Sequence, residues 1–240
     1  MRLRLTLEYD GTGFHGWAAQ PGLRTVEGEL RRALTEVYGS FDALAVAGRT
    51  DTGVHARGQV TSVDVDGGPP PARAAEALNT ALPGDVSVLA AAEADPVFHA
   101  RHSARSRAYR YRIFRRRTPS PFEARRSWWL PRPLDVDALR RGAALLVGNH
   151  DFRAFTPAET QHEVFTRDVL HAAWLERGEH LEFEIEAVSF LRHMVRTLVG
   201  TMVDLDPDRI APLLEGADRS KAGRTAPPWG LYLERVTYSS

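Results

Sequence analysis

The order in which the hydrophobic periodicity changes along the chain is its most constraining feature, because the same order occurs twice. In the first half, leucines alternate with other residues over 2–8, and a helical pattern starts at Thr25 and ends at Gly39. Four further segments follow: strands at 44–47, 59–65 and 86–89, and an alanine-rich helix near 72–78. The resulting order, β-α-β-β-α-β, is that of a ferredoxin-like unit.

The second half of the chain repeats this order. The strand "AYRYRIF" places Tyr109, Tyr111 and Ile113 on one face. A helix starting at Asp135 then turns four apolar residues inward: Leu139, Ala143, Leu146 and Val147. A hairpin that turns at "RGE", a helix in "FLRHMVRTLVGTMV" and a strand in "LYLERVTY" complete the repeat. We therefore predict an α+β protein of two ferredoxin-like halves, 1–106 and 107–240, whose sheets lie side by side and form a central cleft.

Composition excludes several classes of protein. Hydrophobic residues make up 43% of the chain and charged residues 26%, as in soluble globular proteins. No apolar run approaches the roughly 20 residues that a membrane-spanning helix needs. The chain contains no cysteine, which excludes disulfides, thiolate metal sites and a cysteine nucleophile. The N-terminus alternates charged residues with leucine, unlike a secretory signal, so we predict a cytoplasmic protein without a membrane anchor.

The distribution of charge points to a polyanionic partner. The net charge is zero, yet ten arginines fall between Arg101 and Arg126, against the single acid Glu123. Only one of the 31 basic residues, Lys221, is a lysine. A coding bias explains part of this scarcity of lysine, but it does not explain the clustering of the arginines. Since arginine binds phosphate in a bidentate manner and stacks on bases, the cluster predicts a nucleic-acid footprint, and the central cleft is then an RNA-binding cleft.

The stretch "AGRTDTGVHARG" contains the most prominent candidate for chemistry. Gly48 and Gly53 have the spacing of a phosphate-binding loop, but the lysine that would follow is replaced by Val54. What remains is Asp51 beside Arg49. Asp51 is either a turn residue or a nucleophile, and a paired arginine would keep its carboxylate ionised.

Two other side chains allow two interpretations each. Tyr109 is either a core aromatic or a base-stacking residue, since arginines lie on the opposite face of its strand. Arg196 lies on an otherwise apolar helix, where it either extends to solvent or pairs with a carboxylate such as Asp51. The histidines lack the spacing of a zinc site, and no dinucleotide-binding fingerprint is present.

Six motifs together resemble the bacterial tRNA pseudouridine synthase A family. They occur in the order of that family and cover nearly the whole chain: "EYDGTGFHGW", "AGRTDTGVHARGQV", "FHARHSARSRAYRYRI", "LVGNHDFRAF", "FLRHMVRTLVG" and "GLYLERVTY". One position departs from the family, which usually has a glutamine where this chain has Ala18, although Gln20 is retained.

The resemblance implies an isomerase that converts uridine to pseudouridine at positions 38, 39 and 40 of the tRNA anticodon stem-loop. It implies no cofactor, no metal and a homodimer that binds tRNA. By motif, Asp51 matches the nucleophilic aspartate, Tyr109 the tyrosine that packs on the target uracil, Arg49 the arginine that helps to flip the base, and Arg196 the arginine that pairs with the aspartate.

Two other functions are weighed against this one. A methyltransferase that attacks the uracil ring would ordinarily need a cysteine, which is absent, and a methyl-donor site, of which the sequence shows no sign. A non-catalytic RNA-binding module of two ferredoxin-like halves would share the fold and the arginines. Release of tritium from C5-labelled uridine separates the isomerase from the binding module.

Overall fold

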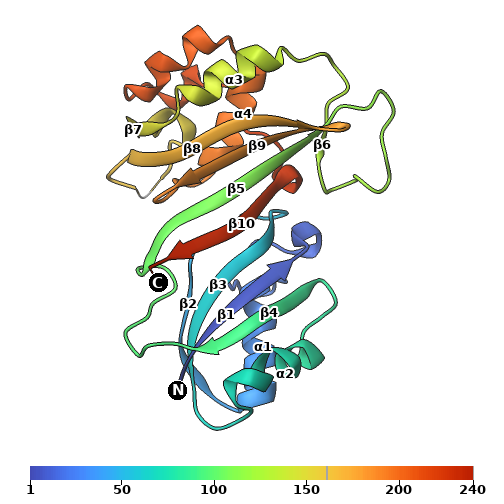
Figure 1. Cartoon of the computed structure of the whole chain (residues 1–240), viewed down its shortest axis with the longest axis vertical. Helices are drawn as coiled ribbons and strands as arrows, with labels where there is room; N and C mark the ends of the chain where they lie inside the picture. Colours follow the sequence, from blue (N-terminus) through green and yellow to red (C-terminus); the bar gives the residue numbers. More distant parts are fainter. Residues whose placement is uncertain (161, 240) are drawn as a thin grey trace. The chain divides into compact units, whose positions relative to one another are not determined.

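The structure is a computed structural model that describes residues 1–160 and 162–239. It confirms the predicted α+β class, and its residues form two compact units. The first unit contains Met1–Arg105 together with the residues from Tyr232 on, and the second contains Ser106–Leu231. Each unit contains both strands and helices (Figure 1).

The first unit has the predicted β-α-β-β-α-β order followed by the last strand of the chain. Its elements are β1 (Arg2–Tyr9), α1 (Val26–Tyr38), β2 (Phe41–Val46), β3 (His55–Val65), α2 (Pro71–Ala81), β4 (Val86–Glu93) and β10 (Leu231–Tyr238). Strand β1 lies between β3 and β4 and is antiparallel to both. Strand β3 also pairs with β2 in an antiparallel manner and with β10 in parallel. The arrangement β4-β1-β3-β2 is ferredoxin-like.

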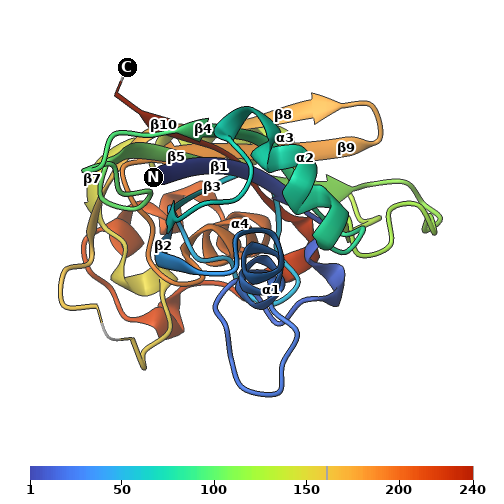
Figure 2. The same cartoon turned by 90° about the horizontal axis from the view of Figure 1, so that it is seen from below.

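Local sequence explains the first helix. The Thr25 side chain accepts a hydrogen bond from the Gly28 amide at 3.2 Å and caps α1, and Gly39, at φ 76°, ends it. One face of α1 is buried together with the leucines of β1 (Figure 2, where α1 is seen almost end-on): Val26, Leu30, Ala33 and Leu34 of the helix, and Leu3, Leu5 and Leu7 of the strand. The predicted alternation of β1 is confirmed.

The second unit contains a hairpin sheet covered by helices. Its elements are β5 (Ala104–Phe114), β6 (Trp128–Trp129), α3 (Val136–Ala144), β7 (Gly148–Asp151), β8 (Thr166–Arg177), β9 (His180–Ala187) and α4 (Met194–Asp204). The strand order is β5-β9-β8-β7, antiparallel throughout, and β6 pairs in parallel with β5. Helices α3 and α4 contact each other, and α3 packs on β8 (Figure 1).

The predicted faces of the central strands are confirmed. Tyr109, Tyr111 and Ile113 of β5 are buried. So are the alternate residues of β9: Leu181, Phe183 and Ile185. The α3 prediction is wrong at Val147, which is 45% exposed, because the helix ends at Ala144 and the chain then turns away.

The last strand departs from the predicted division at 106. We predicted one half over 107–240, but β10 from Tyr232 on groups with the first unit. The reason is parallel pairing of Tyr232 with His55 and of Leu233 with Ala56. The Tyr238 hydroxyl also donates a hydrogen bond to the Ala100 carbonyl at 2.7 Å.

Six short 3-10 helices connect these elements and were not predicted. They are η1 (Gly11–Gly13), η2 (Arg153–Phe155), η3 (Pro207–Arg209), η4 (Ala211–Leu214), η5 (Arg219–Lys221) and η6 (Pro228–Gly230). The start of α4 was also misplaced. His193 adopts a left-handed conformation at φ 61°, so the helix begins at Met194 and not at Phe190.

Candidate active site

Asp51 lies in the tight loop between β2 and β3 of the first unit. Its side chain is half-buried, Arg49 is exposed, and Thr50 between them is buried. The Val54 amide donates a hydrogen bond to the Asp51 carbonyl at 3.1 Å, and Gly53, at φ 78°, completes the turn. The loop therefore presents a carboxylate and a guanidinium group from a fixed backbone.

A buried polar network fixes this loop from below. The Tyr9 hydroxyl shares a hydrogen bond of 2.7 Å with the Thr50 hydroxyl and accepts one of 3.3 Å from the Gln59 side-chain amide. Gln59, which is fully buried, also donates to the Gly48 carbonyl at 2.7 Å. Burial raises the pKa of Tyr9 to about 12, opposed by its hydrogen bonds with Thr50 and Gln59, so the phenol stays protonated at neutral pH. The network ties both sides of the loop to the strands β1 and β3.

The segment that follows β1 also holds the Asp51 loop by backbone hydrogen bonds. The Trp17 amide donates to the Thr50 carbonyl at 3.0 Å, and the Gly53 amide donates to the Phe14 carbonyl at 3.3 Å. Gly16 adopts φ 85°, and a Cβ atom there would lie 2.8 Å from the Thr50 carbonyl oxygen. The motif "EYDGTGFHGW" thus supports the Asp51 loop, a role that the sequence analysis did not predict.

His55 has a structural position at the start of β3. It is buried, and its Nδ1 accepts a hydrogen bond from the Gly11 amide at 3.0 Å. Its ring stacks on Tyr232, with 4.6 Å between centroids. A Cβ atom on Gly11 would overlap the Val54 carbonyl, so only glycine allows this close approach.

Tyr109 lies in β5 of the second unit and is 9% exposed. Its ring meets Phe190 edge to face, with centroids 5.0 Å apart and an interplanar angle of 83°. Residue 109 is therefore a largely buried aromatic whose ring is held in orientation by a second aromatic.

Arg196 lies in α4 and is held by the chain that runs beside this helix. Its Nε donates to the Ala226 carbonyl at 2.9 Å, and the Ala226 amide donates to the Arg196 carbonyl at 3.0 Å. Burial raises the pKa of Tyr111, and the charge of Arg196 opposes that shift, so the two side chains are electrostatic neighbours. The Tyr111 hydroxyl donates to the Pro227 carbonyl at 2.8 Å.

The four predicted site residues are thus divided equally between the units. Asp51 and Arg49 lie in the first unit, and Tyr109 and Arg196 lie in the second. The pairing of Asp51 with Arg196 stays a prediction. At the departure noted above, Ala18 is half-buried, and the exposed Gln20 side chain donates a hydrogen bond to the His15 carbonyl at 3.4 Å.

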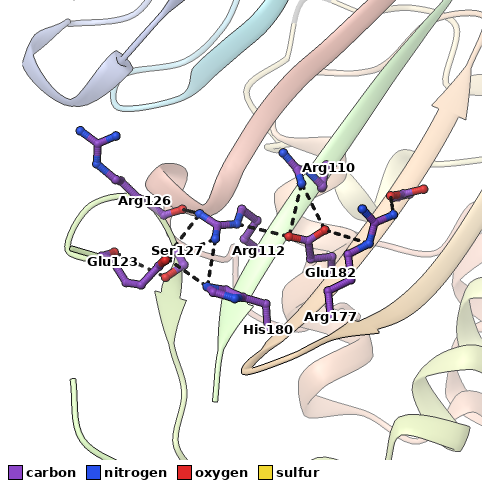
Figure 3. Close-up of polar contacts among 9 residues, drawn as sticks. Arg110, Arg112, Glu123, Arg126, Ser127, Arg177, His180 and Glu182 are labelled. Atoms are coloured by element: carbon purple, nitrogen blue, oxygen red, sulfur yellow. Dashed lines mark hydrogen bonds and ion pairs between the residues drawn. The ribbon is translucent and has the colours of Figure 1, made fainter. Parts of the chain in front are cut away.

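Several arginines of the cluster are paired with acids inside the second unit (Figure 3). Glu182, 3% exposed, lies within 3.2 to 3.4 Å of three guanidinium groups, those of Arg110, Arg112 and Arg177. Arg112 also pairs with Glu123 at 3.3 Å. Six of the ten arginines are exposed, and we limit the predicted nucleic-acid footprint to them: Arg101, Arg105, Arg116, Arg117, Arg125 and Arg126.

Two features are absent from residues 1–160 and 162–239. Within these ranges no helix is both long and apolar enough to cross a membrane. Nor do three histidine, aspartate or glutamate side chains come together there in a group that would hold a metal ion.

Comparison with known proteins gives one consistent family. A family model described as tRNA pseudouridine synthase matches residues 143–239. A tRNA pseudouridine synthase A of Moorella thermoacetica is 45% identical over 98% of this chain and 99% of the relative. Proteins of the same name from Paramagnetospirillum magneticum and Bacillus subtilis are 44% and 40% identical, over 100% of this chain and 96% and 100% of theirs. The chain therefore belongs to the tRNA pseudouridine synthase A family.

Proposed function

We propose that this protein isomerises uridine to pseudouridine at positions 38, 39 and 40 of the anticodon stem-loop of tRNA, with Asp51 as the nucleophile. Membership of the family makes the chain an isomerase that acts on tRNA. The observation that carries the finer proposal is the position of Asp51: a half-buried carboxylate beside Arg49 on a loop held from two sides by hydrogen bonds.

The reaction requires few groups. The N1–C1′ bond breaks, the uracil turns, C5 bonds to C1′, the C5 proton leaves, and N1 gains a proton. One carboxylate serves as nucleophile, either at C6 of the ring or at C1′ of the sugar. A second carboxylate, as in glycosidases, is not needed because water does not enter the reaction.

The other predicted residues have distinct roles in this proposal. Arg49, exposed beside Asp51, helps to flip the target base, and Tyr109 packs on the extruded uracil. Arg196, oriented by the Ala226 carbonyl, pairs with the Asp51 carboxylate. Extruding a base costs a few kcal/mol, which contacts between exposed arginines and phosphates offset.

Assembly and location follow from the family resemblance. We propose a homodimer in the cytoplasm, which binds tRNA and needs neither cofactor nor metal. Sedimentation at micromolar concentration tests the dimer, for which we expect roughly twice the 26.7 kDa mass of one chain. A monomer that still modifies tRNA would contradict it.

The decisive experiment is Asp51→Asn, assayed by release of tritium from C5-labelled uridine in tRNA. Asparagine retains the volume and turn preference of aspartate but cannot act as a carboxylate nucleophile. We expect near-native affinity for tRNA and no release above background. The matched control is Asp66→Asn, an exposed aspartate of the first unit that lies in another glycine-containing loop, directly before Gly67, and this variant should release tritium at the wild-type rate. Full activity of Asp51→Asn would refute the nucleophile, and no release by the wild type would favour the RNA-binding module.

A further inference from the structure

The loop between β5 and β6, residues 115–127, has an unusual tip. We refer to it as the arginine arm, since five of its residues are arginine. The side chain of Phe122 at its tip is 85% exposed. A single exposed apolar side chain is common on protein surfaces, so the exposure of Phe122 has meaning only together with the fixed backbone, the charges and the aromatic rings around it.

The chain directly after Phe122 is fixed to the sheet, so the exposure of Phe122 is not that of a loose loop. Glu123, the next residue, lies 3.3 Å from Arg112 and 3.2 Å from His180 (Figure 3). Its backbone carbonyl accepts from the amides of Arg126 at 3.0 Å and Ser127 at 3.2 Å. Burial alone would raise the pKa of Glu123, but its hydrogen bonds with His180 and Ser127 and the charge of Arg112 bring that pKa below its usual value. The carboxylate thus stays ionised and holds the loop to the sheet.

The charge around Phe122 is strongly positive. Glu123 is the single acid of the arginine arm, and Arg112 neutralises it from outside the loop. Arg115 pairs with Glu176 at 2.7 Å. The arginines on either side of the tip are exposed: Arg116, Arg117, Arg125 and Arg126. A surface of this charge attracts a polyanion and repels a second copy of itself.

Two further aromatic rings lie beside the arm. The Arg125 guanidinium group lies 5.9 Å from the centre of the half-buried Trp229 ring. Trp129 is 42% exposed, and its indole N–H donates to the Arg116 carbonyl at 2.9 Å. Alternating aromatic faces and guanidinium groups are how proteins bind single-stranded nucleic acid, because bases stack on the rings while phosphates meet the cations.

Trp229 is linked along the chain, within the second unit, to a residue of the candidate active site. Trp229 follows Pro227 and Ala226 in the chain, and Ala226 exchanges two hydrogen bonds with Arg196. The Tyr111 hydroxyl holds Pro227 at 2.8 Å. The ring platform at Trp229 is therefore connected through three residues of chain to the arginine that we assign to the pairing with Asp51.

We propose that Phe122 stacks on an unstacked base of the tRNA, while Arg117, Arg125 and Arg126 bind the neighbouring phosphates. This proposal rests on the proposed function, since that function supplies the tRNA. An unpaired base is required because a base inside a duplex offers no free face to a phenyl ring. The arginine arm thus recognises single-stranded nucleotides of the substrate outside the target position itself.

The test is a series at residue 122 in the Asp51→Asn background, where no turnover occurs. The probe is an in-vitro transcribed tRNA with uridine at position 39, titrated at fixed salt. We expect Phe122→Trp to bind as well as the parent, and both Phe122→Leu and Phe122→Ala to bind about 5- to 100-fold more weakly, because leucine keeps the apolar volume but not the ring. A blunt RNA duplex should bind all four proteins equally. Val97→Ala, an equally exposed apolar residue of the first unit, is the matched control and should change nothing.

Each other outcome overturns the stacking contact. Equal affinity for phenylalanine and leucine would show that the ring is not used, and equal weakening on the duplex would show a contact with no base. If Phe122→Ala changed the sedimentation mass, the residue would contact a second copy of the chain. Tritium release by the wild type is measured separately, so failure of the isomerase and failure of the stacking contact remain distinguishable.

Discussion

Removal of a single hydroxyl, in Tyr9→Phe, tests whether the buried network positions Asp51. The Tyr9 hydroxyl is buried and bonded to Thr50 at 2.7 Å and Gln59 at 3.3 Å. The variant leaves the Thr50 hydroxyl and one N–H of Gln59 without these contacts, whereas Gln59 keeps its bond to the Gly48 carbonyl. Leaving buried polar groups short of partners costs about 1–3 kcal/mol. For a chain of this size, each kcal/mol lowers Tm by about 2–4 °C.

The effect on the reaction should exceed the effect on binding. A misplacement of a catalytic group by about 1 Å costs about 100-fold in rate. Because Thr50 directly precedes Asp51, we expect the single-turnover rate of pseudouridine formation to fall about 10- to 100-fold, with the Kd for tRNA unchanged within about twofold. The assay is rapid-quench tritium release with enzyme in excess, together with a binding titration of the same preparation.

Tyr38→Phe is the matched control for this prediction. Tyr38 is buried in the same unit and donates a hydrogen bond to the Pro69 carbonyl at 3.4 Å, away from the Asp51 loop. It should lower Tm without lowering the single-turnover rate. A rate unchanged in Tyr9→Phe, or lowered equally in both variants, would refute the positioning role.

The pKa of Tyr9 adds a test by pH. Since burial raises the pKa from about 10 to about 12, the phenol stabilises the folded state fully below pH 10, and this contribution is lost as pH rises toward 12. Phenylalanine does not titrate. The Tm difference between wild type and Tyr9→Phe should therefore shrink between pH 10 and 12, and a constant difference would contradict the burial argument.

Two further predictions concern ion pairs. Glu182→Gln should lower the free energy of unfolding by about 3 kcal/mol in urea denaturation, because it leaves three guanidinium groups around a buried neutral amide. The control, Glu184→Gln, breaks one exposed pair with Arg177 and should lower it by less than about 1 kcal/mol. Equal losses in the two variants would disprove the prediction for Glu182. Arg2 donates two hydrogen bonds to Asp64 and lowers the pKa of Asp64. The pair therefore stabilises the fold above pH 3.8, and this stabilisation is lost as the pH falls below that value. The Tm difference between wild type and Asp64→Asn should shrink in acid, and a difference that persists at low pH would contradict this prediction.

Periodicity predicted the elements well where their faces are decided locally. Alternation in β5 and the helix start at Thr25 need only neighbours in sequence, and both are confirmed. The start of β3 was missed because His55 and Ala56 become strand residues through pairing with Tyr232 and Leu233, a partner that no local pattern contains. Pairing between distant segments is what sequence periodicity does not encode.

The candidate site was predicted through its motifs more than through its chemistry. Asp51 and Arg49 stand out as a charged pair among glycines, but their support does not. Gln59 lies fully buried in β3, where a polar residue looks like an exposed position of the strand. Glu182, which pairs with both Arg110 and Arg112, also lies far away in sequence, at a cross-strand position on β9. The register that joins the two strands is not visible in the sequence.

The position of β10 has a consequence for how the chain is made. A ribosome releases the first unit's strands β1 to β4 long before β10, because the whole of 106–231 is translated in between. Until then, the edge of β3 at His55 and Ala56 has unpaired backbone groups, the ring of His55 lacks Tyr232, and Gly58 lacks the Glu234 carbonyl that packs against it. Folding of the two units is therefore interleaved and not sequential, and the start of β3, directly after the loop that carries Asp51, acquires its β10 neighbours only after 106–231 has been translated.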